Sequence, residues 1–243
     1  MSRKLNNQEF VKVFNSYIIE GKFNEKSNYY SVYKFRYKTL IKYFCDLVED
    51  CKKVTILDVG GGQYAMICKK MWDDLVYVAD IDNRNFEFLN VNQIETINCD
   101  LTKNPISIDK KFDVIFLSEV IGHIPIPPHI ILSNLKSMLK KGGFLIMSTP
   151  NLYRIRNVLY MALGKRIFDN FTYADKAIGR FCEYSKNQVE WQLKTAGFEK
   201  FKILLKHLTY KRSSLLFNII SFLGMPFFII PRFRDNLVVI AQN

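Results

Sequence analysis

Two different hydrophobic patterns divide the chain near residue 53. Before it, apolar residues recur every three or four positions over residues 6–20 and 33–48, which predicts two amphipathic helices. After it, short and nearly continuous apolar runs alternate with helix-like segments. The sequence therefore predicts an N-terminal helical lid or cap over residues 1–52, followed by one main domain over residues 53–243.

The apolar runs are typical of strands that are buried on both faces. They are rich in β-branched residues and carry few charges, as parallel strands covered by helices do. The runs are VTILDV (54–59), LVYVAD (75–80), FDVIFLS (112–118), GFLIMST (143–149), FKILLKHLTY (201–210) and NLVVIAQ (236–242). We therefore expect an α/β fold with a doubly wound, mostly parallel sheet and helices on both of its faces.

Two segments interrupt this alternation. Residues 151–184 carry basic and aromatic side chains, and we interpret them as an insertion on the substrate side of the sheet. Residues 213–231 contain no charged side chain and are flanked by lysines and arginines. Their length approaches that of a membrane span, but Asn218, Gly224 and Pro226 argue against a simple spanning helix. A membrane-interfacial element and a hairpin buried in protein both stay open as interpretations.

The charge balance favours an anionic partner. The 243 residues carry 35 Lys and Arg against 23 Asp and Glu, for a formal net charge of +12 at pH 7. A basic excess of this size attracts phosphate, nucleic acid or a membrane surface. The alternative is a compositional bias of the whole organism, because Lys, Asn, Ile and Phe are all abundant. The charged fraction of 24% is that of a globular chain and excludes general disorder.

Cysteine usage and the N-terminal residues favour the cytoplasm. The chain contains five cysteines, an odd number, and no two of them are spaced C-x-x-C. We therefore expect reduced, buried thiols instead of a disulfide framework or a zinc ribbon. Residues 1–10 lack the apolar core of a secretory signal. We expect a cytoplasmic protein, located at the inner face of the membrane if residues 213–231 touch lipid.

The first strand ends in a glycine turn that can hold a nucleotide-like ligand. In VTILDVGGGQYA, Gly60 and Gly62 allow close backbone approach, and the following helix offers its N-terminal amide groups. The turn alone fits either a dinucleotide or S-adenosylmethionine. Asp58 would repel a pyrophosphate but attract the ammonium group of S-adenosylmethionine, although a helix-capping role is the alternative. We therefore favour the methyl donor over NAD.

Five segments, in this order, resemble the class I S-adenosylmethionine-dependent methyltransferases, in particular the small-molecule O-methyltransferases of ubiquinone biosynthesis. They are DVGGGQY, VYVADID, NCDLTKNPI, FDVIFLSEVIGHIP and EYSKNQVEWQLKTAGFEKFKI. The first departs from the family pattern because Tyr64 stands where a third glycine is usual. The resemblance implies a seven-stranded sheet of order 3-2-1-4-5-7-6 whose last strand, residues 236–242, is antiparallel.

The resemblance also implies a cofactor site at the carboxyl ends of the first, second and fourth strands. Asp80 matches the acid that binds the ribose hydroxyls, with Asp82 as a near rival. Asp100 matches the residue that binds the adenine amino group, beside Leu101. The full set of expected cofactor contacts is Asp58, Gly60, Gly61, Gly62, Asp80, Ile81, Asp82, Asp100, Leu101 and Ser118.

Two side chains after the fourth strand are candidates for catalysis. Methyl transfer requires an acceptor in line with the sulfonium carbon, and a hydroxyl acceptor often also needs a base. Histidine as a residue type titrates near neutrality, and the resemblance implies that His123 lies near the methyl group of the cofactor. We therefore expect His123 to be the base, with a pocket-shaping role or metal ligation as the alternatives. Glu119 is a second candidate base or a cofactor contact. We expect transfer without a metal ion, because the sequence suggests no carboxylate cluster beyond the cofactor site.

The acceptor is expected to be small and anionic. Tyr153, Arg154 and Arg156 follow the fifth strand, and arginines bind phosphate and carboxylate in a bidentate manner. This favours O-methylation of a sugar, or of a phosphorylated or lipid-linked glycan precursor, whereas a solvated basic helix is the alternative. Two rival functions stay open. The first is an RNA methyltransferase, with which the charge is compatible but which no appended RNA-binding motif supports. The second is a non-catalytic nucleotide-binding domain of the same fold.

Overall fold

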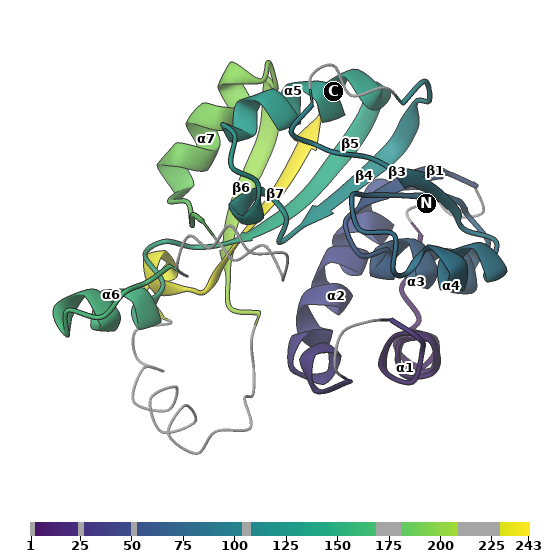
Figure 1. Cartoon of the computed structure of the whole chain (residues 1–243), viewed down its shortest axis with the longest axis horizontal. Helices are drawn as coiled ribbons and strands as arrows, with labels where there is room; N and C mark the ends of the chain where they lie inside the picture. The colour runs from purple at the N-terminus through teal and green to yellow at the C-terminus, as the bar shows by residue number, and fades with distance from the viewer. Residues whose placement is uncertain (1–2, 24–26, 50–52, 104–107, 169–180, 209–228) are drawn as a thin grey trace.

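A single seven-stranded sheet organises the chain (Figure 1). The computed structural model describes residues 3–23, 27–49, 53–103, 108–168, 181–208 and 229–243. The strands are β1 (Thr55–Val59), β2 (Leu75–Asp80), β3 (Glu95–Asn98), β4 (Phe112–Ser118), β5 (Leu139–Pro150), β6 (Lys200–Lys206) and β7 (Asn236–Gln242). Their order is β3-β2-β1-β4-β5-β7-β6, with β7 antiparallel to β5 and β6 and every other pair parallel. The predicted fold, strand order and antiparallel last strand are confirmed.

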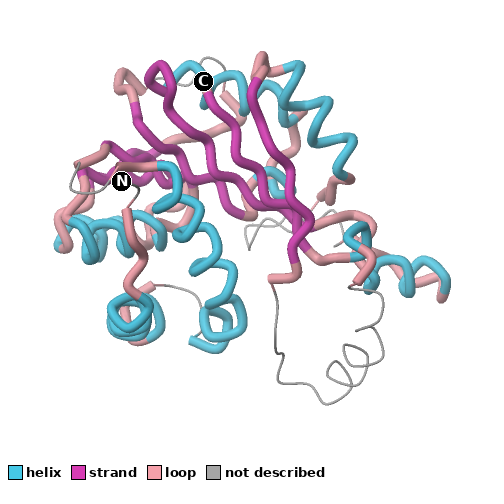
Figure 2. Tube along the Cα trace, turned by 180° about the vertical axis from the view of Figure 1, so that it is seen from behind, coloured by secondary structure: helices cyan, strands magenta, loops and turns pink. Residues whose placement is uncertain are grey.

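Helices cover both faces of this sheet (Figure 2). One face carries the α-helices α1 (Asn7–Val13), α2 (Ser27–Leu47), α3 (Gln63–Trp72) and α4 (Phe86–Val91), and the π-helix η1 (Phe14–Ile19). The other face carries α5 (Pro128–Met138) and α7 (Lys186–Thr195). A further helix, α6 (Ile155–Ala162), follows β5 and projects away from the sheet (Figures 1 and 2). Two short 3-10 helices are η2 (Ile121–His123) and η3 (Pro231–Phe233).

Each central strand contributes to two separate hydrophobic cores, because successive side chains point to opposite faces. In β1, Ile56 packs with the N-terminal helices and α3, whereas Leu57 packs with α5 and α7. In β4, Phe116 and Leu117 divide in the same way. This double burial explains why the strands read as continuous apolar runs in the sequence instead of an alternating pattern.

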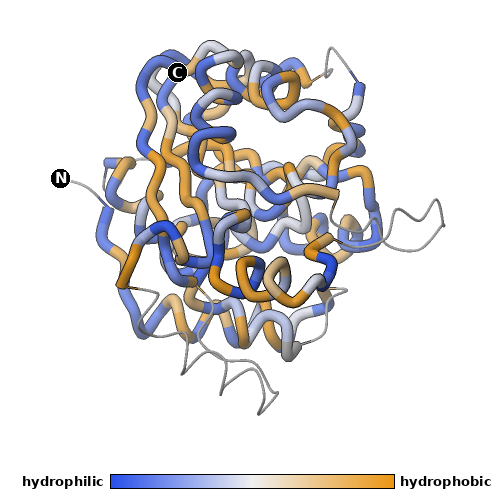
Figure 3. Tube along the Cα trace, turned by 90° about the vertical axis from the view of Figure 1, so that its left-hand side faces the viewer, coloured by the Kyte–Doolittle hydropathy of each residue, from blue (hydrophilic) through white to orange (hydrophobic). Residues whose placement is uncertain are grey.

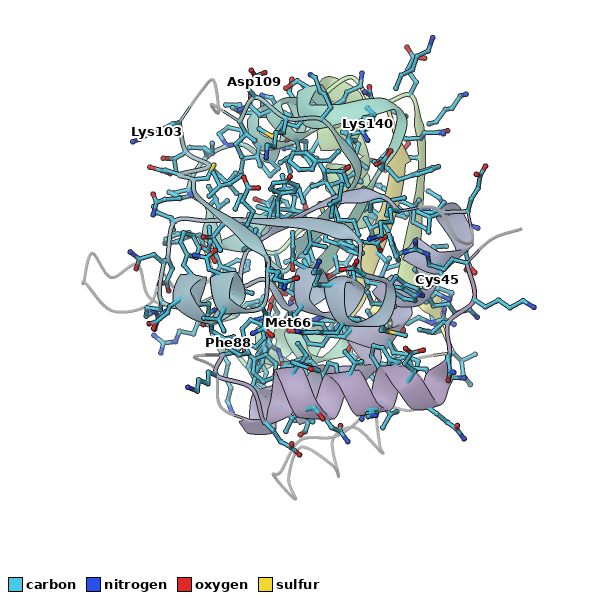
Figure 4. All side chains as sticks on the ribbon, turned by 90° about the vertical axis from the view of Figure 1, so that its right-hand side faces the viewer. Cys45, Met66, Phe88, Lys103, Asp109 and Lys140 are labelled. Atoms are coloured by element: carbon cyan, nitrogen blue, oxygen red, sulfur yellow. The ribbon has the colours of Figure 1, made fainter. Side chains whose placement is uncertain are left out.

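The N-terminal helices share a core with the sheet domain. Met66 of α3 (labelled in Figure 4) is fully buried in the core that also includes residues of α1 and α2. Ahead of α1, the guanidinium of Arg3 forms a buried ion pair with Asp74, with nitrogen–oxygen distances of 2.6 and 3.1 Å. These contacts fix the predicted cap segment to α3 and β2 on one face of the sheet.

Two predicted segments fall partly outside the described residues. Within the predicted insertion 151–184, the structure describes α6 and residues 181–184, but not residues 169–180. Within the uncharged segment 213–231, it describes only residues 229–231. Among the helices of the described ranges, none is both long enough and apolar enough to cross a membrane.

Candidate functional site

A cavity of about 840 Å³ opens at the carboxyl ends of β1, β2 and β4. This is the edge at which open α/β sheets bind ligands, and the volume lies within the range of small-molecule sites. The described residues that line it are Val59, Gly60, Ala79, Asp80, Ile81, Asp82, Arg84, Cys99, Asp100, Leu101, Thr102, Glu119, Val120, His123, Ile124 and Pro125. Six expected cofactor residues, together with Glu119 and His123, therefore line one cavity.

The two outer glycines of the turn between β1 and α3 serve different purposes. Gly60 lines the cavity with a φ of +114°, a backbone conformation that other residues rarely adopt. Gly62 has a φ of +87°, and a Cβ there would lie only 2.9 Å from a methyl carbon of Leu89. Gly60 thus brings backbone to the ligand, whereas Gly62 lets α4 pack against the turn.

Asp58 caps α3, which is the alternative role considered for it from the sequence. Its Oδ2 accepts hydrogen bonds from the backbone N–H groups of Tyr64, at 2.8 Å, and Ala65, at 3.0 Å. The side chain is buried, and it is not among the described residues that line the cavity. Burial raises the pKa of Asp58 to about 7, although the two amide hydrogen bonds oppose this shift. Asp58 therefore fixes the turn against the start of α3, and its expected attraction for a ligand ammonium group stays a prediction.

Of the four acidic residues that line the cavity, Asp80 and Asp82 both lie at the end of β2, and their local partners distinguish them. Asp82 forms an ion pair with Arg84, whose Nε lies 2.6 Å from Oδ2. Asp80 is half-buried, and its Oδ1 accepts a hydrogen bond from the backbone N–H of Asp82 at 3.0 Å. Burial raises the pKa of Asp80. The arrangement favours Asp80 over Asp82 as the ligand-binding acid.

Asp100 follows β3 and lines the same cavity as Gly60. Its Oδ1 accepts hydrogen bonds from the backbone N–H of Thr102, at 2.9 Å, and from the hydroxyl of the same residue, at 2.7 Å. These bonds hold the pKa of Asp100 below its ordinary value. The carboxylate is therefore ionised at neutral pH and fixed in orientation beside Leu101.

Glu119 is held in a strained conformation by three other elements. Its φ is +63°, which is unfavourable for a residue with a side chain and costs on the order of 1–3 kcal/mol. Oε1 accepts hydrogen bonds from Ser148 on β5 and Asn236 on β7, each at 3.0 Å. Oε2 lies 3.7 Å from the guanidinium of Arg36 on α2. The side chain thus reaches the cavity only because α2, β5 and β7 converge on it.

The arginine behind Glu119 was not anticipated from the sequence. Arg36 is buried, donates a hydrogen bond to the hydroxyl of Tyr29 at 3.1 Å, and lies over the rings of Tyr33 at 4.5 Å and Tyr37 at 5.5 Å. Burial lowers its pKa, but the carboxylate of Glu119 and the tyrosines more than reverse this and raise it. The sequence did contain a signal for a buried ion pair. Arg36 directly precedes Tyr37 in the apolar stripe of α2, and a buried charge is costly unless it is paired.

Tyr64, which replaces the usual third glycine, points into the core and not into the cavity. Its ring stacks on Phe116 at 4.8 Å, and its hydroxyl lies 3.1 Å from Oγ of Ser118. Ser118 in turn lies 2.9 Å from Oγ of Ser148, which contacts Glu119. Ser118, which was expected to contact the cofactor, therefore belongs to the network that supports Glu119.

His123 lines the same cavity as Glu119. It ends η2, its side chain is half-buried, and its backbone N–H bonds to the carbonyl of Val120 at 2.9 Å. Position and residue type are compatible with the expected base, which stays a prediction. Within the described ranges, no three His, Cys, Asp or Glu side chains come together in a way that could hold a metal ion.

The expected acceptor residues lie outside the cavity lining and have protein partners. Arg154 and Arg156 both pair with the buried carboxylate of Glu183, and both contact the side-chain oxygen of Asn157. Tyr153, by contrast, is half exposed to solvent. The sequence pattern could not show this, because Glu183 lies 29 positions after Arg154. Glu183 holds the two arginines side by side, and their role in binding an acceptor stays a prediction.

Comparisons with known proteins agree with this geometry. The family described as Methyltransferase domain matches residues 33–203. A SAM-dependent methyltransferase from Archaeoglobus fulgidus superposes with a TM-score of 0.57 at 17% identity, over 88% of this chain and 99% of that one. The N-methyltransferase NodS from Bradyrhizobium japonicum, in complex with S-adenosyl-L-homocysteine, superposes with a TM-score of 0.50 at 14% identity, over 97% of both chains. No curated protein matches in sequence.

Proposed function

The chain belongs to the methyltransferase domain family, and we propose that it transfers a methyl group from S-adenosylmethionine to a hydroxyl group of a small anionic acceptor. The observation that carries the proposal is the single cavity at the carboxyl ends of β1, β2 and β4, with Asp80, Asp100, Glu119 and His123 on its walls. The cavity combines Asp80 and Asp100, which suit a nucleoside, with Glu119 and His123, which suit a polar acceptor.

The cavity lining fits the methyl donor. Gly60 lets the ligand approach the backbone at the end of β1, and Asp80 offers a carboxylate to the ribose diol. Asp100 and Leu101 provide an acceptor and an apolar contact for an adenine ring. When bound, the donor supplies an activated methyl group, so the protein has mainly to align the acceptor with the carbon–sulfur bond.

We assign the removal of the acceptor proton to His123. An imidazole that titrates near neutrality is suited to this task, and it faces the cavity that Glu119 also lines. Glu119, fixed by three elements, orients the donor or the acceptor on this side. The resemblance of SEVIGHIP to the ubiquinone-biosynthesis O-methyltransferases supports a hydroxyl acceptor over an amine.

An anionic acceptor is supported by the pair of arginines beyond β5. Arg154 and Arg156 both pair with the carboxylate of Glu183, and these three side chains together carry a formal charge of +1. Fixed guanidinium groups bind phosphate or carboxylate at a lower entropic cost than mobile ones. A phosphorylated or lipid-linked sugar is therefore the acceptor class that we propose.

Calorimetric titration with S-adenosyl-L-homocysteine tests the cofactor site. We expect binding by the wild type and a loss of at least about tenfold in affinity for Asp80→Ala, because a charged hydrogen-bond acceptor for the ribose is removed. Asp82→Ala is the matched control, since that carboxylate is paired with Arg84, and it should change affinity little. Equal losses in both variants, or binding of NAD in preference, would contradict the assignment.

A donor with a labelled methyl group tests the acceptor class. The enzyme is incubated with a cell extract that has been divided into small polar molecules, lipids and RNA. We expect label in the small-molecule or lipid fraction, and a decrease of about 10²-fold or more for His123→Gln without loss of S-adenosyl-L-homocysteine binding. Label confined to RNA would overturn the proposal in favour of an RNA methyltransferase.

A further inference from the structure

The C-terminal end of α6 exposes large apolar side chains to water. Every residue from 159 to 166 is exposed. The exposed fractions are 40% for Leu159, 52% for Met161 and 67% for Leu163. The opposite face of the helix packs against the protein, where Asn157 is buried and donates a hydrogen bond to Glu183. Contiguous apolar groups of this kind usually mark a surface that another molecule covers.

A second apolar pair lies near the base of this helix. Ile229 is 78% exposed and Ile230 is 41% exposed, just before η3. The side-chain amide of Asn151, at the end of β5, donates hydrogen bonds to the carbonyls of Arg232 at 2.7 Å and Arg234 at 2.8 Å. These bonds hold the start of β7 against the strand end from which α6 departs.

We call these groups together the α6 surface: Leu159, Tyr160, Met161, Leu163, Ile229 and Ile230, with the basic side chains Lys165, Arg166 and Arg232. Figure 3 views the molecule from the side on which α6 projects and colours the apolar positions of the helix orange. Figures 1 and 2 show that the helix extends outward from the body of the protein. An outward projection of this kind allows contact with an extended, flat partner.

The charged side chains named for the α6 surface, Lys165, Arg166 and Arg232, are all basic. Residues 151–168 contain four Lys and Arg and no Asp or Glu, although Arg154 and Arg156 pair with the buried carboxylate of Glu183. Lys165 and Arg166 follow α6 directly, and Arg232 lies in η3 beside Ile230. Apolar side chains bordered by basic ones are the composition of elements that lie in the interface of an anionic bilayer.

We propose that the α6 surface docks the protein on a membrane that contains anionic phospholipids. The apolar side chains of α6 and the pair before η3 would enter the boundary between headgroups and acyl chains, while Lys165, Arg166 and Arg232 contact the phosphates. The contact that we propose is peripheral, because it uses only side chains exposed at the surface of α6 and just before η3. This proposal rests on exposure and charge alone, and not on the proposed methyl transfer.

A second copy of the chain fits this surface less well. A symmetric contact would bring the basic side chains of two α6 surfaces together, and like charges at close range repel. An anionic lipid surface supplies both the apolar phase and the opposite charge. The charges and exposed apolar side chains of the α6 surface thus favour lipid over self-association, and the experiment below distinguishes the two.

Co-sedimentation with vesicles tests the proposal. One set contains phosphatidylcholine alone and the other also contains phosphatidylglycerol. We expect the wild type to bind the anionic vesicles at low salt and to dissociate as salt screens the charges. Met161→Glu should weaken partitioning by about tenfold, because it places a carboxylate where an apolar side chain enters the interface. Val91→Glu is the matched control, because Val91 is 79% exposed at the end of α4, on the opposite side of the molecule from α6 (Figure 1).

Both variants should remain folded, since each replaces a side chain that is already in water, and circular dichroism checks this. Wild-type binding that Met161→Glu weakens and Val91→Glu does not would support the proposal. Absence of wild-type binding to anionic vesicles would overturn it, as would equal binding by Met161→Glu. A wild-type dimer that Met161→Glu dissociates, without vesicle binding, would overturn it in favour of a second copy. None of these outcomes depends on methyl transfer.

Discussion

The buried ion pair between Arg36 and Glu119 links the N-terminal helices to the cavity, and its removal should be measurable. Glu119→Gln preserves the shape of the side chain and its hydrogen-bond acceptor for Asn236 and Ser148. It removes only the negative charge that faces Arg36. The substitution therefore isolates electrostatics from packing.

The magnitude follows from the geometry of the pair. At 3.7 Å and an effective dielectric constant of about 20, the interaction of two unit charges is about 4 kcal/mol. Breaking a buried pair typically costs about 3–5 kcal/mol. The hydroxyl of Tyr29 and the rings of Tyr33 and Tyr37 still stabilise the guanidinium of Arg36. We therefore expect Glu119→Gln to lower the free energy of unfolding by about 2–4 kcal/mol.

A double-mutant cycle measured by urea unfolding tests this reasoning. The cycle compares wild type, Glu119→Gln, Arg36→Met and the double variant. The double variant should lose less stability than the sum of the two single variants, by at least about 1 kcal/mol. The control is Asp73→Asn, because Asp73 pairs with Lys53 and Lys69 at the exposed surface and should change stability by no more than about 0.5–1 kcal/mol. Additivity within about 0.5 kcal/mol would show that the pair carries no net coupling and would refute the argument.

Two further predictions concern the turn after β1. Gly62→Ala should destabilise the fold by about 1–3 kcal/mol, because Gly62 has a positive φ and a new Cβ would meet Leu89. Gly164→Ala is the control, because Gly164 also has a positive φ but faces open space. Thermal unfolding should show a smaller loss of stability for Gly164→Ala than for Gly62→Ala. For Asp58, a pKa raised from 3.8 to about 7 means that the folded state keeps a proton that the unfolded chain releases. The free energy of unfolding should therefore fall as pH rises between these values. In urea unfolding, the wild type should lose about 2 kcal/mol more than Asp58→Asn between about pH 5 and pH 7. A difference that stays constant with pH would contradict this.

The sequence predicted most of the fold because the strands are buried on both faces and therefore stand out as apolar runs. β3 is the exception, since its exposed and half-buried positions give no continuous run, and only the family resemblance implied a strand before Asp100. Asp80 and Asp100, which the sequence places after neighbouring strands, line one cavity, because the end of a parallel strand fixes the edge of the sheet on which a residue lies.

The partners of those side chains were less predictable. Asp58 could cap α3 or face a ligand, and only the distances to Tyr64 and Ala65 separate the two roles. The partner of Arg154 and Arg156 is Glu183, from a distant part of the sequence. Hydrophobic periodicity reports which face of an element is buried, but it carries no information on which buried polar groups meet. That information arises only when distant elements pack.

The position of β7 bears on when the enzyme becomes competent during its synthesis. Asn236 on β7 donates a hydrogen bond to Glu119, 117 positions earlier in the chain, and β7 also fills the place between β5 and β6. A nascent chain that has emerged only as far as β6 therefore has a gap in its sheet and a strained Glu119 without one of its donors. Late, long-range pairing of this kind is slow. Most of the chain can therefore leave the ribosome before the site for the methyl donor is complete.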